Sequence, residues 1–206
     1  MSVWTNHEMG RKVIEIIPDR SVVNLGIGLP SIIADINHDK EIVLQSENGV
    51  LGVSGRPKKG KASPSLINAA KETINICEGG SFFDSSLSFS MIRGGHIDAA
   101  VLGGMQVDVQ GSLANWKVPG KKINGMGGAM DLVNGPRIVI VMMKHFKDLE
   151  QKLVQSCSLP LTGKGCVDYI VTELGVFKPT NEKFKILELS NSSEFFSRID
   201  KSIYME

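Results

Sequence analysis

Apolar residues along this chain of 206 residues follow two different patterns. From His7 to Ile17 they recur at the spacing of one helical face, and the Pro-Asp-Arg sequence that follows ends the helix. Elsewhere they come in short consecutive runs, which predict strands beginning near Ser21 and over residues 41–45, 72–77, 98–103, 137–143, 169–172 and 184–189. Further helices are predicted from Pro30 onward and over residues 64–71, 84–93 and 193–201.

Consecutive rather than alternating apolar positions are typical of strands that are covered on both faces. Because predicted helices fit between several of these strands, the sequence predicts an α/β fold with an open, mainly parallel, layered sheet flanked by helices. Hydrophobic residues make up 42% of the chain and charged residues 22%, so residues 1–206 are expected to form a single soluble domain.

Charge and composition exclude several classes of partner and site. A net charge of +1 and a pI near 7.7 predict no nucleic-acid partner and no anionic membrane surface. No apolar run approaches the ~20 residues of a membrane span, and the first residues lack the order of a secretory signal, so a cytoplasmic location is expected. The three cysteines show no CxxC spacing and the four histidines are scattered, which predicts buried thiols and no metal site.

One charged residue stands at an unusual place, in the sequence IVLQSENGVLGV (42–53). Glu47 follows a predicted buried strand and precedes Asn48-Gly49, a strong turn signal. If this turn joins a hairpin, Glu47 is an exposed residue beside it. If the strand is instead internal to the sheet, as its consecutive apolar positions indicate, Glu47 lies just past its carboxyl end, where open α/β sheets bind ligands.

The sequence NLGIGLP (24–30) also lies between a predicted strand and a predicted helix. It lacks the third glycine of GxGxxG, and no acidic residue follows at a convincing spacing, so no dinucleotide site is expected. Asn24, Gly26 and Gly28 are expected either to line a substrate pocket or to allow close packing of strand and helix. The basic sequence KKGK (58–61) is predicted to be a solvated loop rather than a phosphate contact.

Several motifs together closely resemble the B, or beta, subunit of class I CoA-transferases, the 3-oxoacid and acetate/acetoacetate group. They are NLGIGLP (24–30), QSENG (45–49), SFFDSSLSFSMIRGGHID (81–98), LANW (113–116), VPGK (118–121), GMGGAMDLV (125–133) and LPLTGKG (159–165). Their order and spacing cover nearly the whole chain. The chain departs from the family's pattern after residue 143 and in its C-terminal tail, which bears on substrate preference or subunit packing rather than on the motifs.

This resemblance implies that Glu47 is the catalytic nucleophile and that coenzyme A is a substrate, with no permanently bound cofactor. An ionised glutamate needs no general base, so it can attack a thioester directly, giving an acyl-glutamyl anhydride and then a glutamyl-CoA thioester in a ping-pong reaction. Gly127, Gly128 and Ala129 are expected to direct backbone N–H groups at the oxyanions that form.

The resemblance also implies a separate A subunit that contributes to CoA binding, in an α2β2 heterotetramer. The substrates are expected to be short acyl-CoAs, such as succinyl-CoA or acetyl-CoA, and short carboxylic acids such as acetoacetate. Asn48 is expected to orient the Glu47 carboxylate or to make an Asx-type turn contact, and Gly49 to belong to the substrate pocket.

Two segments could have either of two structural roles, and two other functions are also compatible with the sequence. Phe82, Phe83, Phe89 and Met91 are expected in the core rather than as a wall against pantetheine. Residues 107–122 are expected to form a structured loop that covers the site or meets the A subunit. A sugar-phosphate isomerase or deaminase and a non-catalytic metabolite-sensing subunit are also compatible with this class of fold.

Overall fold

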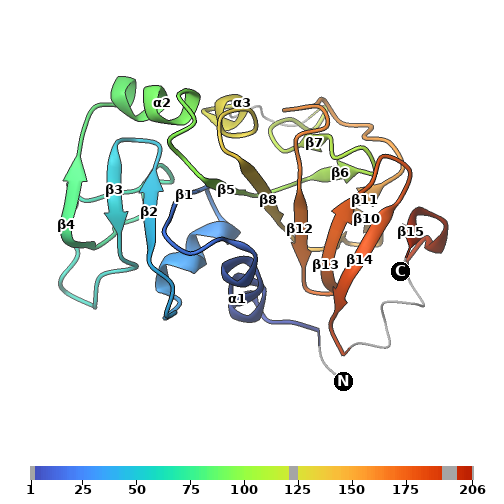
Figure 1. The fold of residues 1–206 in the computed structure, drawn as a ribbon, viewed down its shortest axis with the longest axis horizontal. Helices are drawn as coiled ribbons and strands as arrows, with labels where there is room; N and C mark the ends of the chain where they lie inside the picture. Colours follow the sequence, from blue (N-terminus) through green and yellow to red (C-terminus); the bar gives the residue numbers. More distant parts are fainter. Residues whose placement is uncertain (1–2, 121–124, 192–198, 206) are drawn as a thin grey trace.

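The computed structural model describes residues 3–120, 125–191 and 199–205, in which ten strands form one mixed sheet (Figure 1). The strand order is β15-β14-β13-β12-β8-β5-β1-β2-β3-β4. Their bounds are β1 Ser21–Leu25, β2 Ile42–Ser46, β3 Val50–Val53, β4 Ile76–Phe82, β5 Ala99–Leu102, β8 Ile138–Met142, β12 Tyr169–Thr172, β13 Gly175–Pro179, β14 Phe184–Leu189 and β15 Tyr204–Met205. The five central strands, from β12 to β2, pair in parallel, which confirms the predicted α/β class with an open, mainly parallel sheet.

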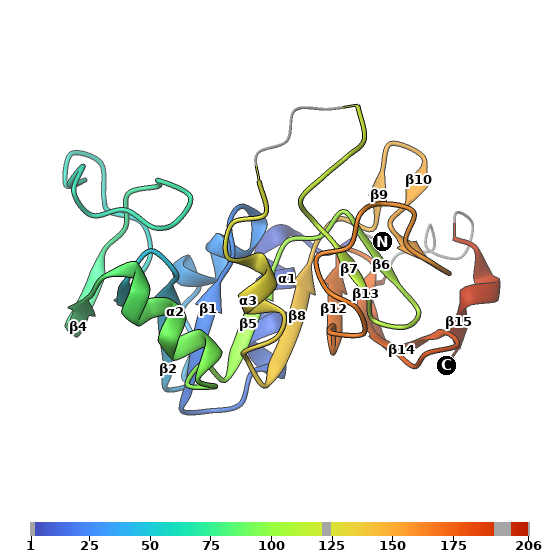
Figure 2. The same ribbon diagram turned by 90° about the horizontal axis from the view of Figure 1, so that it is seen from above.

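Helices cover both faces of this central region, as the consecutive apolar positions predict. Helix α1 (Asn6–Ile16) and the 3₁₀ helix η1 (Leu29–Asp35) share one apolar core with the sheet, while α2 (Ser85–Arg93) and the short α3 (Ala129–Leu132) lie against the other. Figures 1 and 2 show α2 and α3 beside each other, and Figure 1 shows them on the opposite side of the sheet from α1. All four residues of β5 are buried, because this strand lies between the two cores.

The N-terminal helix begins and ends where its sequence dictates. Thr5 accepts a hydrogen bond from the Glu8 N–H, and the Glu8 side chain accepts one from the Thr5 N–H, which forms a capping box. The helix ends at Ile16, and Ile17 is extended, as a residue before proline usually is. With 11 residues α1 is the longest helix described, and none within the described ranges could cross a bilayer.

Three predicted elements differ from the structure. Residues 64–71 form no helix; instead residues 66–74 form a small hairpin-like turn with a bridge between Ile67 and Thr73. The strand predicted over 72–77 begins only at Ile76. The helix predicted over 193–201 falls mostly outside the described residues, and Lys201 begins the short 3₁₀ helix η2 (Lys201–Ile203).

The apolar pattern also missed several very short strands. They are β6 Gln106–Asp108, β7 Leu113–Ala114, β9 Phe146–Lys147, β10 Glu150–Gln151 and β11 Leu153–Val154. Strands β11, β6 and β7 form a three-stranded sheet, so part of the long loop expected over 107–122 is regular structure. The Asp108 carboxylate accepts hydrogen bonds from the Gln110 and Ser112 N–H groups and so fixes the turn between β6 and β7.

The order of the parallel strands determines where a site can form. From β1 the chain passes to β2 on one side, whereas β5, later in the sequence, pairs with β1 on its other side. The order of the strands therefore reverses between β1 and β5. In open α/β sheets, ligands bind outside the carboxyl ends of the strands at such a reversal.

Candidate active site

Glu47 is the first of the three residues that connect β2 and β3. Ser46, the last residue of β2, pairs with Val50, the first residue of β3. The hairpin and the internal strand, treated as alternatives from the sequence, both occur: β2 pairs antiparallel with β3 and parallel with β1. The two are compatible because β3 is itself internal, pairing with β4 on its other side, so neither arm of the hairpin needs an alternating pattern. Glu47 is therefore a half-buried residue at the carboxyl end of a central strand.

A cleft of about 370 Å³ opens where the strand order reverses. Its floor comes from the carboxyl ends of three neighbouring strands: Leu25 to Ile27 at the end of β1, Glu47 after β2, and Leu102 with Gly103 at the end of β5. The remaining described lining residues are Ala69, Asn115, Trp116, Gly125, Met126, Gly127, Gly128, Ala129 and Leu132. Glu47 is the single ionisable side chain among these described residues.

The carboxylate of Glu47 lies directly against Gly128, which precedes α3. The Gly128 N–H donates a hydrogen bond to the carboxylate. A Cβ atom at Gly128 would lie 2.7 Å from Glu47 Oε2 and 2.6 Å from Phe89 Cζ, so a larger residue has no space there. Glycine is needed at this position because the carboxylate and the aromatic ring approach the backbone closely.

The surroundings of Glu47 raise its pKa. Burial is the largest cause; the Gly128 N–H lowers the pKa, and the negative charge of Asp131 raises it. Asp131 is itself paired with Arg93 from the end of α2, with 2.7 Å between Arg93 Nε and Asp131 Oδ1. Glu47 is thus a partly desolvated carboxylate, and a higher pKa increases the basicity of its oxygens.

Comparison with known proteins identifies the family to which this chain belongs. The family model described as Coenzyme A transferase matches residues 7–197. This chain belongs to the coenzyme A transferase family. The match spans most of both cores and every element that builds the floor of the cleft, so the CoA-transferase assignment covers the site as well as most of the sheet.

Curated relatives and solved structures resemble this CoA-transferase chain over most of its length. It is 55% identical over 168 residues to the B subunit of the succinyl-CoA:3-ketoacid coenzyme A transferase of Helicobacter pylori, covering 81% of each chain. It is 46% identical to the beta subunit of the acetate CoA-transferase of Escherichia coli, covering 90% of this chain and 86% of that one. The acyl-CoA transferase YdiF of Escherichia coli O157:H7 shares the fold, with a TM-score of 0.73 at 17% identity; the match covers 100% of this chain and 42% of YdiF.

The site residues expected from the CoA-transferase sequence fall into two groups. Gly26, Gly127, Gly128 and Ala129 line the cleft together with Glu47. The other four, Asn24, Gly28, Asn48 and Gly49, are absent from the lining that the described residues form.

Each residue of the second group has another structural setting. Asn24 is fully buried and donates a hydrogen bond to Gln45 Oε1 at 2.5 Å. Gly28 is exposed at φ 86°, ahead of η1. Asn48 Nδ2 donates to the Ile67 carbonyl at 2.8 Å rather than to Glu47. At Gly49, with φ 110°, the Phe83 carbonyl oxygen occupies the space that a side chain would need.

Several residues of the CoA-transferase cleft were not singled out from the sequence. Asn115 forms part of the wall, where its Nδ2 donates to the Gly103 carbonyl at 3.1 Å and its Oδ1 accepts from Thr162 at 2.6 Å. The Trp116 indole beside it donates to the Leu161 carbonyl. The motif LANW, which contains both residues, could have indicated them as site residues. An apolar wall residue such as Ala69 belongs to no motif, so a single sequence does not mark it as part of the site.

Two further expectations, the burial of the aromatic residues around α2 and the burial of the thiols, hold only in part. Phe89 is half-buried and packs on the core, whereas Phe82 is 62% exposed, so the core prediction was wrong for Phe82. Cys77 is exposed, contrary to the expected burial. Cys157 and Cys166 are half-buried, and burial raises their pKa values to about 12 and about 11. Within the described ranges no three His, Cys, Asp or Glu side chains are grouped to hold a metal ion.

Proposed function

We propose that this chain is the catalytic-glutamate subunit of a CoA-transferase that moves CoA between a short acyl-CoA, such as succinyl-CoA or acetyl-CoA, and a 3-oxoacid such as acetoacetate. The observation that carries the proposal is the chemistry of the cleft: among its described lining residues only Glu47 can ionise, and it lies at the strand-order reversal. The names of the Helicobacter pylori and Escherichia coli relatives support this choice of substrates.

The proposed reaction uses the Glu47 carboxylate as a nucleophile and then as the carrier of CoA. Its oxygen attacks the thioester carbonyl carbon, the C–S bond breaks, and CoA leaves as a thiolate while an acyl-glutamyl anhydride forms. The thiolate then attacks the Glu47 carbonyl carbon, and the donor acid leaves as a carboxylate. An acceptor carboxylate reverses both steps. No proton is transferred, in keeping with a described lining in which Glu47 is the single ionisable side chain.

Gly128 is the best-placed oxyanion donor in this scheme. When the thiolate attacks Glu47, negative charge develops on an oxygen of Glu47 itself, and the Gly128 N–H is already hydrogen-bonded to that carboxylate. The Ala129 N–H is directed at the Met126 carbonyl, at 3.3 Å, so Ala129 supports the turn more directly than it supports the oxyanion. Gly127, at φ 55°, allows the chain to bend into this position.

We further propose that a separate A subunit completes the site, in an α2β2 assembly. The relatives are named as B or beta subunits, and YdiF, which has the same fold, is a longer chain of which this one covers 42%. The cleft is open on this chain, yet both the anhydride and the glutamyl thioester must be kept from water. Ile27, which lines the cleft and is 60% exposed, is an apolar surface that a partner could cover.

Turnover of the reconstituted complex tests the proposal. Glu47→Gln keeps the size of the side chain and removes the nucleophile, so transfer from succinyl-CoA to acetoacetate should fall to background. Glu78→Gln is the matched control, because Glu78 is exposed on β4 and absent from the cleft lining. Normal turnover in a folded Glu47→Gln complex would refute Glu47 as the nucleophile, whereas a metabolite-sensing subunit would keep its ligand binding in the variant and show no turnover in either form. A sugar-phosphate enzyme is disfavoured because no lysine or arginine occurs among the described lining residues.

A further inference from the structure

The segment 66–74 is a compact hairpin-like turn held by its own hydrogen bonds. The Asn68 N–H donates to the Glu72 carbonyl at 2.9 Å, and the Ile74 N–H to the Leu66 carbonyl at 3.0 Å. The Asn68 Oδ1 accepts from the N–H groups of Ala70 and Glu72. This side chain gives the backbone an alternative to helical hydrogen bonding, which explains why the helix predicted here does not form.

The first arm of this turn is attached to both residues that flank Glu47. On one side of Glu47, the buried Ser46 Oγ accepts a hydrogen bond from the Ala69 N–H at 3.0 Å. On the other side, Asn48 Nδ2 donates to the Ile67 carbonyl at 2.8 Å. Since both anchors join the same three residues, 67–69, to the catalytic turn, the position of Ala69 is fixed relative to Glu47.

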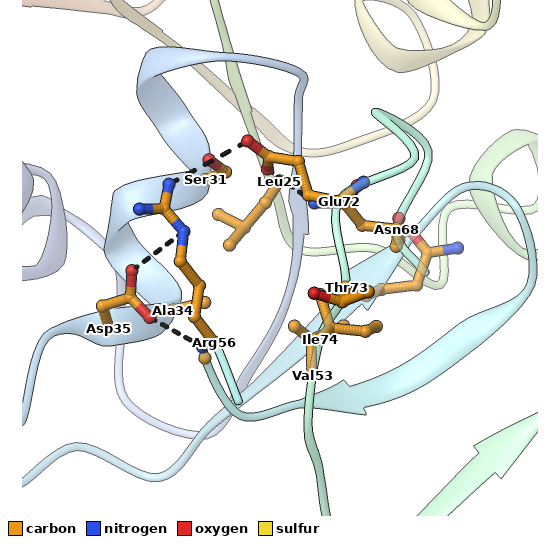
Figure 3. A pocket seen from close by; sticks show the side chains of 13 residues that line it. Leu25, Ser31, Ala34, Asp35, Val53, Arg56, Asn68, Glu72, Thr73 and Ile74 are labelled. Carbon is orange, nitrogen blue, oxygen red and sulfur yellow. Dashed lines mark hydrogen bonds and ion pairs between the residues drawn. The ribbon is translucent and has the colours of Figure 1, made fainter. Parts of the chain in front are cut away.

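The second arm of the turn, which contains Glu72 opposite Asn68, is held to the rest of the fold by charged groups. Glu72 accepts from Asn68 Nδ2 at 3.0 Å and lies 3.9 Å from a guanidinium nitrogen of Arg56, which also pairs with Asp35 at the end of η1. Figure 3 shows Arg56 between these two carboxylates, with Asn68, Glu72 and Thr73 on the neighbouring segment. The turn is thus supported from behind as well as from the catalytic loop.

Ala69 is the one residue of this turn that lines the cleft. In the proposed anhydride, the acyl chain begins at an oxygen of Glu47 and must extend into the cleft between its walls. The wall containing Ala69 is fixed to the residues on either side of Glu47, so it limits the space close to the acyl carbons. A methyl group at this position leaves room that a longer side chain would fill.

We propose that Ala69 is a specificity-determining residue that sets how long an acyl chain the cleft accepts, with Ser46 as its positioning residue. The inference rests on the proposed role of Glu47. One methylene in an apolar pocket typically changes selectivity by about 10- to 200-fold. Ala69→Leu should therefore disfavour butyryl-CoA against acetyl-CoA, and Ala69→Gly should shift the ratio in the opposite direction.

The test compares kcat/KM for butyryl-CoA and acetyl-CoA in the complete two-subunit enzyme. For Ala69→Leu the butyryl-to-acetyl ratio should fall at least about 10-fold. Ala70→Leu is the matched control: Ala70 is the next residue of the same turn and is absent from the cleft lining, so its ratio should stay within about twofold. Ser46→Ala frees the Ala69 N–H and should weaken the discrimination while leaving Glu47 reactive.

An unchanged ratio in both Ala69 variants, or an equal change in Ala70→Leu, would overturn the role of Ala69. If Ala69→Leu does not fold, the opposite shift expected of Ala69→Gly decides the question. Borohydride reduction of the glutamyl-CoA thioester at Glu47, which leaves an alcohol and releases CoA, separates this inference from the proposed function. Reduction at Glu47 without any change of ratio refutes only the role of Ala69, whereas no reduction in the wild-type enzyme refutes the nucleophile itself.

Discussion

Replacing Gly128 by alanine should disable the site by steric displacement of Glu47. Gly128 has φ −81°, which alanine adopts without strain, so the backbone itself tolerates the change. The new Cβ would lie 2.7 Å from Glu47 Oε2, at least 0.7 Å short of the 3.4 Å at which ordinary contact begins, and 2.6 Å from Phe89 Cζ. Because both contacts are too short, the carboxylate and the ring must both move.

Moving the carboxylate lowers the rate in two ways, because it misplaces the reacting group and breaks its contact with the Gly128 N–H. A displacement of about 1 Å in a reacting group costs on the order of 10²-fold, and loss of one oxyanion donor costs roughly 10² to 10³-fold. We therefore expect kcat for CoA transfer to fall at least about 100-fold. Overpacking beside Phe89 should destabilise the chain by about 1–3 kcal/mol, measured by urea unfolding.

A double variant separates the two contacts. Phe89→Leu removes the ring atoms that the new methyl group would meet, so Gly128→Ala combined with Phe89→Leu should regain stability while kcat stays low. The matching control is Phe89→Leu alone, which should keep most of the activity because Gly128 still binds Glu47. A kcat within about threefold of wild type in Gly128→Ala, or full recovery in the double variant, would show that the Glu47–Gly128 contact does not matter for the reaction.

Three other predictions follow from charge and burial. At pH 7, Glu47→Gln should unfold at an equal or higher urea concentration than wild type. The pKa of Glu47 is raised in the folded state, so its ionisation at pH 7 lowers the stability of the wild-type protein. The difference between the two proteins should vanish below about pH 4, where Glu47 is protonated in both the folded and the unfolded chain. Arg93→Gln leaves Asp131 unpaired, so the Glu47 pKa should rise further and the acidic limb of the kcat/KM profile should move to higher pH, less so in high salt. His145 is buried and burial lowers its pKa to about 3, so stability should fall as the pH drops below about 6.5, and His145→Gln should reduce that slope in urea unfolding. An unchanged pH profile in Arg93→Gln, or an unchanged slope in His145→Gln, would contradict these assignments.

The central strands could be predicted because burial on both faces imposes a simple pattern. β5 and β8 read as consecutive apolar residues, and both lie between helices. The 66–74 turn could not be predicted, since its form depends on the Asn68 side chain and on contacts with Ser46 and Asn48. Such contacts between distant segments leave no periodic signal in the sequence.

For the site, the sequence indicated the carboxylate but not all of its surroundings. Glu47 stood out through its turn and through its motif. Gly128 could be linked to it only by family resemblance, since 81 positions separate Gly128 from Glu47 in the chain. Asn24 has a pocket-like motif, yet it faces Gln45 on the paired strand and is fully buried. Ala69 is an ordinary residue type whose position only the fold reveals.

The most direct test of covalent catalysis is the mass of the peptide that contains Glu47. The complete enzyme is incubated with acetoacetyl-CoA and no acceptor acid, treated with borohydride, digested and measured by mass spectrometry. The proposed mechanism predicts reduction of a glutamyl-CoA thioester to an alcohol at Glu47, and no such change in Glu47→Gln. An unmodified Glu47 peptide from an enzyme that demonstrably binds several short acyl-CoAs would contradict covalent catalysis by this residue.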